Sequence, residues 1–316
     1  MKKTLACLLS LALSVTSQLF ADGAVPTEAA PAAGQKPLKV LMIGNSFSIC
    51  VLKQMPKIAE ELGLKLDICS LYIGGCSLAK HAANAKNKEA KPYAVSWKYM
   101  SVEPGKEPFR SALGGKDGKK ANIPEMLSAD KWDIVTVQQA SHESWKTESY
   151  EPHGTALLKL IAELAPQAKV YVQQTWSYTP WDGRLAKWGI DPDTMYARLE
   201  AAYDSFAKAH GLDQIRMGKA VQLYRRELPV SYGENSLGGD VCGTDTFKER
   251  GGKWVHSGDA FHLNDRGHYL QGLVWTATLF GADVTKCKTV PKALEKHPEH
   301  AELMRRIAMR VTKGED

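Results

Sequence analysis

Residues 38–48 have the sequence LKVLMIGNSFS, in which an apolar run is followed at once by a short polar turn. An uninterrupted apolar run such as 40–43 is typical of a strand that is buried on both faces. Further strand-like runs occupy residues 64–71, 133–138 and 168–173, with helix-like periodic segments between or after them. This alternation predicts an α/β fold, in which helices cover both faces of a parallel sheet.

Helical spacing of apolar residues runs from residue 51 to residue 62 and stops at Gly63. Because proline disrupts the interior of a helix, Pro56 places the start of the regular helix near Met55. The turn that carries Ser46 can then form a separate short helical piece. Clearer helices are expected over residues 155–164, 192–210 (with Asp191 as the N-cap) and 265–280.

Two long stretches show no such pattern, residues 82–120 and the glycine-rich residues 231–257. We expect both to be loops. Loops of that length in a compact domain are usually functional lids or mobile segments.

A second informative stretch is DAFHLNDRGHYL at residues 259–270, which places Asp259 three residues before His262. Within one helical turn this spacing lets the carboxylate bind the imidazole and orient it. A serine hydroxyl needs such a base before it can act as a nucleophile. Each motif alone is weak, but together they predict a serine hydrolase with Ser46 as nucleophile, His262 as base and Asp259 as the orienting carboxylate.

These two motifs resemble those of the SGNH/GDSL hydrolase superfamily, and the resemblance covers residues 38–280. Residues 44–46 (GNS) match its first block, and residues 259–267 (DAFHLNDRG) match its last block. The resemblance implies a three-layer α/β/α sandwich of flavodoxin-like type and an esterase or lipase that needs no cofactor. It implies the same catalytic roles for the serine, the histidine and the aspartate.

The second block of the superfamily supplies a glycine amide to the oxyanion hole. Residues 72–77 (YIGGCS) stand at that place in this chain. The resemblance therefore implies Gly74 or Gly75 as a donor. A glycine pair that merely permits a tight turn from strand to helix is the structural alternative, and both can hold at once.

The third block departs from the superfamily pattern. Residues 137–142 (VQQASH) replace a GxND motif whose asparagine amide is an oxyanion donor. A glutamine amide offers the same N–H donors from one methylene further out. We therefore expect Gln139, or in second place Gln138, to complete the oxyanion hole in an uncharacterised branch of the superfamily.

Aromatic residues follow the fourth strand-like run, at Trp176, Tyr178 and Trp181. On a loop above the sheet they could stack on sugar rings, and Arg184 could bind an anionic group. The alternative is that these rings pack under the long loops as a satellite core. With the resemblance, this cluster favours short acyl groups, acetyl first, on carbohydrate as the substrate, with lipid esters second.

Three rival hypotheses remain open. His256, Asp259 and His262 recur at intervals of three residues and could instead bind a metal ion in a metal-dependent hydrolase. Cys76 with His81 could form a thiol nucleophile pair. The chain could also be a non-catalytic carbohydrate-binding protein on a hydrolase fold.

The N-terminus has the three parts of a secretory signal peptide, residues 1–21, with cleavage after Ala21. We expect residues 22–37 to be a flexible tether, residues 38–285 to form the hydrolase-like domain and residues 286–316 to form a helical tail. The protein is then secreted or periplasmic. Because no later window offers about 18 uninterrupted apolar residues, we expect no stable membrane insertion.

The chain has a formal net charge of +6 and no basic block of the kind that binds nucleic acid. We therefore expect an ester substrate and no nucleic-acid partner. Without Cys7 five cysteines remain, and an odd count leaves at least one thiol unpaired or one bridge between chains. Buried free thiols are the default expectation, and the oligomeric state is left open.

Overall fold

The computed structural model describes residues 36–114, 119–228, 239–244 and 246–315. The predicted signal peptide and all but the last two residues of the predicted tether lie outside these ranges. Within them, a seven-stranded sheet has the order β4-β3-β2-β1-β5-β6-β7. Its strands are β1 (Leu38–Gly44), β2 (Leu66–Tyr72), β3 (Tyr93–Tyr99), β4 (Lys120–Ala121), β5 (Ile134–Val137), β6 (Lys169–Gln173) and β7 (Asp213–Ile215).

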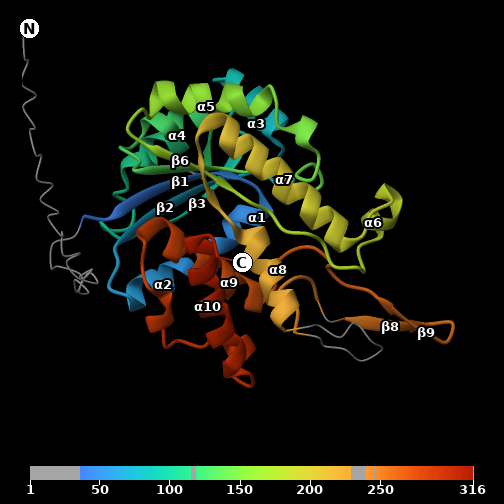
Figure 1. Cartoon of the computed structure of the whole chain (residues 1–316). Coiled ribbons are helices and arrows are strands. Elements are labelled where there is room, and N and C mark those ends of the chain that lie inside the picture. The colour runs from blue at the N-terminus through green and yellow to red at the C-terminus, as the bar shows by residue number, and fades with distance from the viewer. Residues whose placement is uncertain (1–35, 115–118, 229–238, 245, 316) are drawn as a thin grey trace, which may run out of the picture. The chain divides into compact units, whose positions relative to one another are not determined.

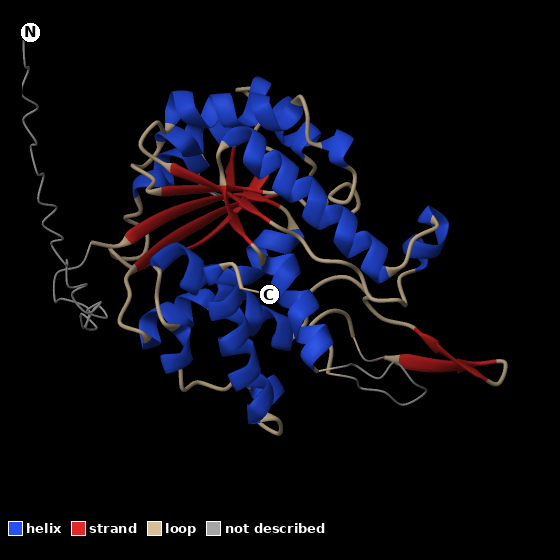
Figure 2. Ribbon diagram, viewed as in Figure 1, coloured by secondary structure: helices blue, strands red, loops and turns tan. Residues whose placement is uncertain are grey.

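Helices cover both faces of this sheet, which gives the three layers expected from the sequence. Figures 1 and 2 show α3, α4, α5 and α7 on one face and α2, α8, α9 and α10 on the other. The α-helices are α1 (Ser46–Ile49), α2 (Met55–Glu61), α3 (Leu78–Lys86), α4 (Ile123–Ser128), α5 (His153–Leu164), α6 (Gly183–Trp188), α7 (Pro192–His210), α8 (Met217–Glu227), α9 (Asp265–Phe280) and α10 (Pro298–Lys313).

Several local predictions are confirmed. The regular helix α2 begins at Met55 with Pro56 in its first turn, and the serine turn is the separate short helix α1. Asp191 caps α7, because its side chain accepts a hydrogen bond from the Thr194 amide at 2.7 Å. The predicted α/β fold with a sheet between two helical layers is likewise confirmed.

The expectation of a long loop over residues 82–120 is wrong. That stretch contains the end of α3 and the strand β3, which pairs antiparallel with β2, so the sheet is mostly rather than wholly parallel. Burial alternates along the first half of β3, since Tyr93 and Val95 are buried while Ala94 and Ser96 are partly exposed. A search for continuous apolar runs misses such a half-buried strand.

The second expected loop, residues 231–257, also contains regular structure. Its described part includes a hairpin of β8 (Phe247–Arg250) and β9 (Lys253–His256), which projects at the lower right of Figure 1, below α6. Gly251 and Gly252 form the two-residue turn between the strands, a dipeptide typical of hairpins.

The C-terminal segment predicted as a helical tail packs into the same core. Helix α10 lies against α8 and α9, and Met304 and Ile307 are fully buried. Among the described residues, no helix combines the length and the apolar character that crossing a bilayer requires.

Truncation of the α10 core should therefore weaken the whole fold. We expect Met304→Ala to lower the free energy of unfolding by about 2–5 kcal/mol, because it removes buried methylenes and leaves a cavity. Glu302→Ala on the exposed face of the same helix is the control and should change it by less than about 0.5 kcal/mol. Unfolding in guanidinium chloride measures both, and equal stability of the two variants would contradict the packing described.

Candidate active site

The serine turn begins where β1 ends. Asn45 caps α1, since its Oδ1 accepts from the Phe47 amide at 3.0 Å and its Nδ2 donates to the Cys76 carbonyl at 3.1 Å. This side chain therefore links the serine turn to the glycine loop after β2. A larger residue in place of Gly44 would require Ser48 to move, because a Cβ atom would lie 2.2 Å from Ser48 Oγ.

Two glutamines hold the same turn from the protein interior. The Phe47 carbonyl accepts a hydrogen bond from Gln173 Nε2 at 2.7 Å and one from Gln271 Nε2 at 2.8 Å. Both glutamines are fully buried and come from β6 and α9. Because buried amides are costly to leave unpaired, these two bonds favour a single position of the turn.

The structure brings together the three residues predicted as a triad. His262 Nε2 lies 2.9 Å from Ser46 Oγ, and His262 Nδ1 lies 2.6 Å from Asp259 Oδ2. The rings of Phe47 and Phe261 pack against the imidazole, with centroids 5.6 and 4.0 Å from its own. The imidazole is thus held by a carboxylate at Nδ1 and by two aromatic rings packed against it at a tilt.

The charge of Asp259 decides which imidazole nitrogen carries the proton. Burial raises the pKa of this carboxyl group, but hydrogen bonds from the His262 ring and from the amides of Phe261 and His262 outweigh burial and lower its pKa to about 2. The ionised carboxylate can only accept, so Nδ1 donates to it. In the neutral ring Nε2 is then free to accept the proton of the Ser46 hydroxyl.

A short antiparallel pairing positions the loop that carries Asp259 and His262. The amides of Gly243 and Thr244 donate to the carbonyls of His262 and Asp259 at 2.7 and 2.8 Å. Gly243 has a φ of +75°, and a Cβ atom there would lie 2.8 Å from the Asp259 carbonyl oxygen. Only glycine combines this backbone conformation with so close an approach.

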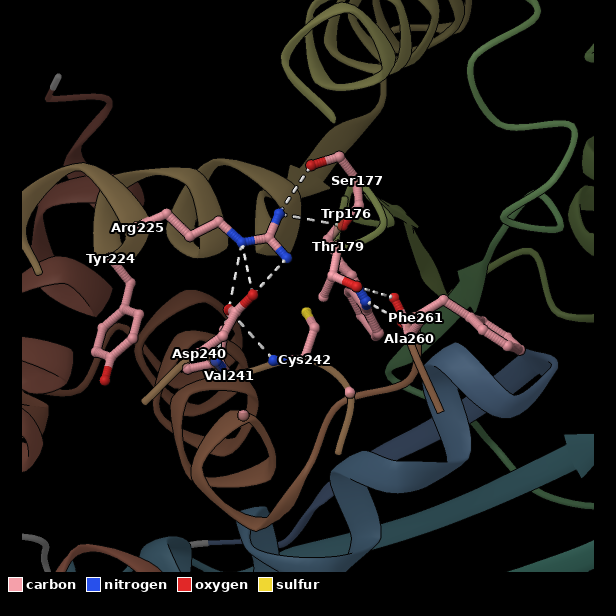
Figure 3. A network of polar contacts seen from close by, with 12 residues as sticks. Trp176, Ser177, Thr179, Tyr224, Arg225, Asp240, Val241, Cys242, Ala260 and Phe261 are labelled. Carbon is pink, nitrogen blue, oxygen red and sulfur yellow. Dashed lines mark hydrogen bonds and ion pairs between the residues drawn. The ribbon is translucent and has the colours of Figure 1, made fainter. Parts of the chain in front are cut away.

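Figure 3 shows the polar network that braces this pairing. The Arg225 guanidinium on α8 donates to both carboxylate oxygens of Asp240 at 3.1–3.3 Å and to the Ser177 hydroxyl at 2.9 Å. Asp240 in turn accepts from the Val241 amide at 2.6 Å. This buried ion pair ties the loop to α8 and to the segment after β6.

The segment after β6 also binds directly to the loop that carries Asp259 and His262. The Trp176 indole donates to the Phe261 carbonyl at 2.8 Å, and the Thr179 hydroxyl donates to the Ala260 carbonyl at 2.9 Å. These bonds appear beside the ion pair in Figure 3. The ion pair and the segment after β6 therefore both hold the loop that carries Asp259 and His262.

A cavity of about 300 Å³ opens beside Ser46. Within the described parts of the chain, the amides of Ser46, Gly74 and Gly75 have no hydrogen-bond acceptor, so they can serve as donors to a bound group. The lining residues are Asn45, Ser46, Phe47, Tyr72, Gly74, Gly75, Ser141, His142, Arg184, Phe261 and His262.

The structure contradicts the prediction that a glutamine of the third block completes an oxyanion hole. Both donors of Gln139 Nε2 are used, on the Ser149 carbonyl at 2.8 Å and on the Ser149 hydroxyl at 3.0 Å, and its Oε1 accepts from the Leu78 amide. Gln138 is buried beside Gly44. Neither glutamine lines the cavity.

The three predicted substrate-binding aromatics do not line the cavity either. Trp176 is fully buried and stacks on Phe47 with centroids 4.2 Å apart. Tyr178 is also buried and shares a hydrogen bond with Ser141 at 2.8 Å. Both pack in the hydrophobic core, in keeping with the alternative that these rings have a structural role, and of the three only Trp181 is exposed, by 36%.

The residues of the metal-site hypothesis do not converge. His256 Nε2 donates to the Thr244 carbonyl at 2.6 Å, while both nitrogens of His262 face Ser46 and Asp259. Another group of three does bring metal-ligand atoms within 4.8 Å of one another among the described residues. It consists of His297, Glu299 and His300, at the start of α10.

The sequence reasoning missed the cavity residues Ser141 and His142. They follow Gln139 in the same third block, so polar residues after the end of β5 were the available signal. Burial is the main reason that the pKa of His142 lies below its ordinary value of 6.5, with the charges of Lys146 and Arg184 adding to this effect and Glu143 opposing it. Its imidazole is therefore neutral at pH 7 and can donate one hydrogen bond and accept another.

A family model described as a domain of unknown function, DUF4886, matches residues 39–200, just over half of the chain. The chain belongs to the DUF4886 family. A solved DUF4886 protein from Bacteroides uniformis is similar, with 25% identity and a TM-score of 0.69, over 89% of this chain and 97% of the other. No curated protein matches.

Solved hydrolases are also among the structures that match this DUF4886 protein. A proposed SGNH hydrolase from Slackia heliotrinireducens is 20% identical, with a TM-score of 0.49, over 77% of this chain and 100% of the other. An acetyl xylan esterase is 14% identical, with a TM-score of 0.45, over 77% of this chain and 100% of the other.

The buried ion pair of this DUF4886 protein should contribute more to the free energy of unfolding than an exposed ion pair does. Side chains of Arg225 and Asp240 are 11% and 5% exposed. We expect Asp240→Ala to lower the free energy of unfolding by about 3–5 kcal/mol, because it leaves a guanidinium buried without its carboxylate.

The control is Glu103→Ala, which breaks the exposed pair of Glu103 with Lys106 and should cost less than about 1 kcal/mol. Chemical denaturation of both variants measures the difference. An Asp240→Ala protein as stable as Glu103→Ala would show that the network does not brace the loop.

The Cys76 thiol should be inert in the native protein. It lies 3.5 Å from His81 Nδ1, yet burial raises the pKa of Cys76 to about 12 and lowers that of His81 to about 3. A neutral thiol beside a neutral imidazole is not an activated nucleophile. The five described cysteines are all free.

We therefore expect iodoacetamide at pH 8 to leave Cys76 unlabelled in the native protein and to label it after unfolding. Mass spectrometry of the digested protein measures the two states. Rapid native labelling of Cys76 would support the thiol pair instead.

Proposed function

We propose that this protein is a serine ester hydrolase that removes short acyl groups, acetyl first, from a carbohydrate alcohol. The observation that carries the proposal is the chain of contacts from Ser46 Oγ through His262 to Asp259, at 2.9 and 2.6 Å. Nucleophile, base and orienting group at these distances are the parts that acyl transfer requires.

In the first half-reaction, Ser46 Oγ attacks the ester carbonyl while His262 Nε2 takes the hydroxyl proton. The carbonyl oxygen becomes negatively charged and accepts hydrogen bonds from the free amides of Ser46 and of Gly74 or Gly75. The tetrahedral adduct then breaks its bond to the alcohol oxygen, and His262 gives the proton to that oxygen. The alcohol leaves, and the acyl group stays on Ser46.

In the second half-reaction, water attacks the acyl group while His262 takes one of its protons. Collapse of the adduct returns the proton to Ser46 Oγ and releases the carboxylic acid. Asp259 stays ionised throughout, in keeping with its pKa of about 2, and stabilises the imidazolium that forms in each half. This sequence of steps needs only water as co-reactant.

The preference for a short acyl group rests on the size of the site. A cavity of about 300 Å³ lies at the lower end of the range for small-molecule sites. For the carbohydrate alcohol the support is Trp181, which lies between Thr179 and Arg184 in the sequence and is 36% exposed; its ring also stacks on His256 and contacts the edge of Phe247. Exposed aromatic faces of this kind can stack on sugar rings.

We also propose that the protein is exported, and the support is the N-terminal sequence alone. Residues 1–21 combine a basic start, an apolar stretch and a small residue at the cleavage position. The enzyme would then meet its substrate outside the cytoplasm.

The test is hydrolysis of 4-nitrophenyl acetate by the wild type and by Ser46→Ala. We expect the substitution to reduce kcat by at least about 10³-fold while leaving the unfolding curve unchanged. His262→Ala should lose nearly as much. Ser205→Ala on the exposed face of α7 is the control and should keep the full rate.

Two further measurements test the mechanism, one with a chelator and one with a longer acyl chain. The rate should persist in the presence of a chelator, and the octanoyl ester should be a poorer substrate than the acetyl ester because of the small cavity. A full rate in Ser46→Ala, or a rate that vanishes with the chelator, would contradict the serine mechanism.

A further inference from the structure

Arg184 is the permanent charge of the cavity wall. Every lining residue lies in the described part of the chain, and none of them is an aspartate, a glutamate or a lysine. The other titratable rings of the wall are those of Tyr72, His142 and His262. A ligand in this cavity therefore meets one fixed positive charge and no fixed negative charge.

The guanidinium is held in place before any ligand binds. Arg184 Nε and Nη2 donate to the two carboxylate oxygens of Asp182 at 2.9 and 2.7 Å. The guanidinium carbon also lies over the rings of Tyr178 and Phe261, 4.4 and 4.1 Å from their centroids. Such preorganisation reduces the entropy that binding would otherwise cost.

The pairing with Asp182 leaves half of the guanidinium available. An arginine has five N–H donors in a planar fork, and the pairing through Nε and Nη2 uses one edge of that fork. The edge formed by Nη1 and the second hydrogen of Nη2 has no acceptor among the described residues. Asp182 itself is 8% exposed and does not line the cavity, so its charge lies behind the guanidinium.

We propose that Arg184 recognises a carboxylate carried by the ester substrate. The free edge presents two parallel N–H donors, which is the geometry that binds a planar carboxylate with two hydrogen bonds. Because Asp182 already balances the charge of the guanidinium, recognition rests on these two directed N–H donors. The inference rests on the proposed function, because it names the class of ester that the same cavity accepts.

Carboxylates near the cavity do not compete for this edge. Glu143 pairs with Lys146 at 3.2 Å, and Asp259 pairs with His262 at 2.6 Å. Hydrogen bonding to Asp182 is the main cause that raises the pKa of Arg184, so the charge persists at every working pH. Arg184 therefore provides the attraction for an anionic ester.

The carboxylate could sit on either side of the scissile bond, and matched pairs of esters distinguish the two. For the alcohol side, the pair is 4-acetoxybenzoate and its neutral methyl ester. For the acyl side, the pair is mono(4-nitrophenyl) succinate and neutral 4-nitrophenyl butyrate. The measured quantity is the ratio of kcat/KM for the anionic ester to that for its neutral partner.

Arg184→Gln removes the charge. We expect it to lower this ratio by about 10- to 100-fold for at least one pair, since hydrogen bonds to charged groups are among the strong ones. Because Asp182 would then lose its partner, the double variant Arg184→Gln with Asp182→Asn restores a neutral hydrogen-bonded pair and should show the same selective loss. Arg198→Gln, whose guanidinium lies over Trp145 outside the cavity, is the matched control and should keep the ratio.

A binding measurement separates this inference from the proposed catalysis. Calorimetric titration of 4-acetoxybenzoate and of its methyl ester into Ser46→Ala should show tighter binding of the anion, and that advantage should disappear when Arg184→Gln is added. If Ser46→Ala loses its rate but neither binding nor turnover favours the anionic ester, the serine mechanism stands and the inference about Arg184 is overturned. An equal loss on charged and neutral esters in both Arg184 variants would overturn it too, since it would assign Arg184 to packing on Phe261.

Discussion

The hydrogen bond between His262 Nε2 and Ser46 Oγ is the constraint on which the rest of the structure depends. It joins two side chains that are 216 residues apart in the chain, one at the end of the first strand and one before α9. A shift of about 1 Å at either end would separate them and, in the proposed mechanism, would greatly reduce the rate. Asn45 fixes one end of this bond, and the buried pair of Arg225 with Asp240 braces the other.

Both ends are fixed by polar groups placed inside the protein, where an unpaired group is costly. The carbonyl of Phe47 is therefore bonded twice, by Gln173 and by Gln271, and the carboxylate of Asp240 is bonded by Arg225 and by backbone amides. Arg184 is held by Asp182 in the same way. The result is a rigid cavity whose polar groups point at positions that are set before a substrate arrives.

The sequence predicts those features that depend on neighbouring residues. The serine after a buried strand, the spacing of Asp259 and His262, the cap of α7 and the break at Pro56 are all local patterns. The role of Gln139 could not be predicted, because the direction of its amide depends on Ser149 and Leu78 in the folded chain. The burial of Trp176 likewise follows from contacts with Phe47 and Phe261, which periodicity does not contain.

The central claim is that His262 makes Ser46 the one activated nucleophile, and covalent trapping tests it most directly. The protein is treated with a fluorophosphonate, which phosphonylates serines whose hydroxyl is deprotonated by a neighbouring base, and the adduct is located by mass spectrometry. We expect a single adduct on Ser46 in the wild type and none in His262→Ala. An adduct on another residue, or equal labelling of Ser46 without the histidine, would contradict the account.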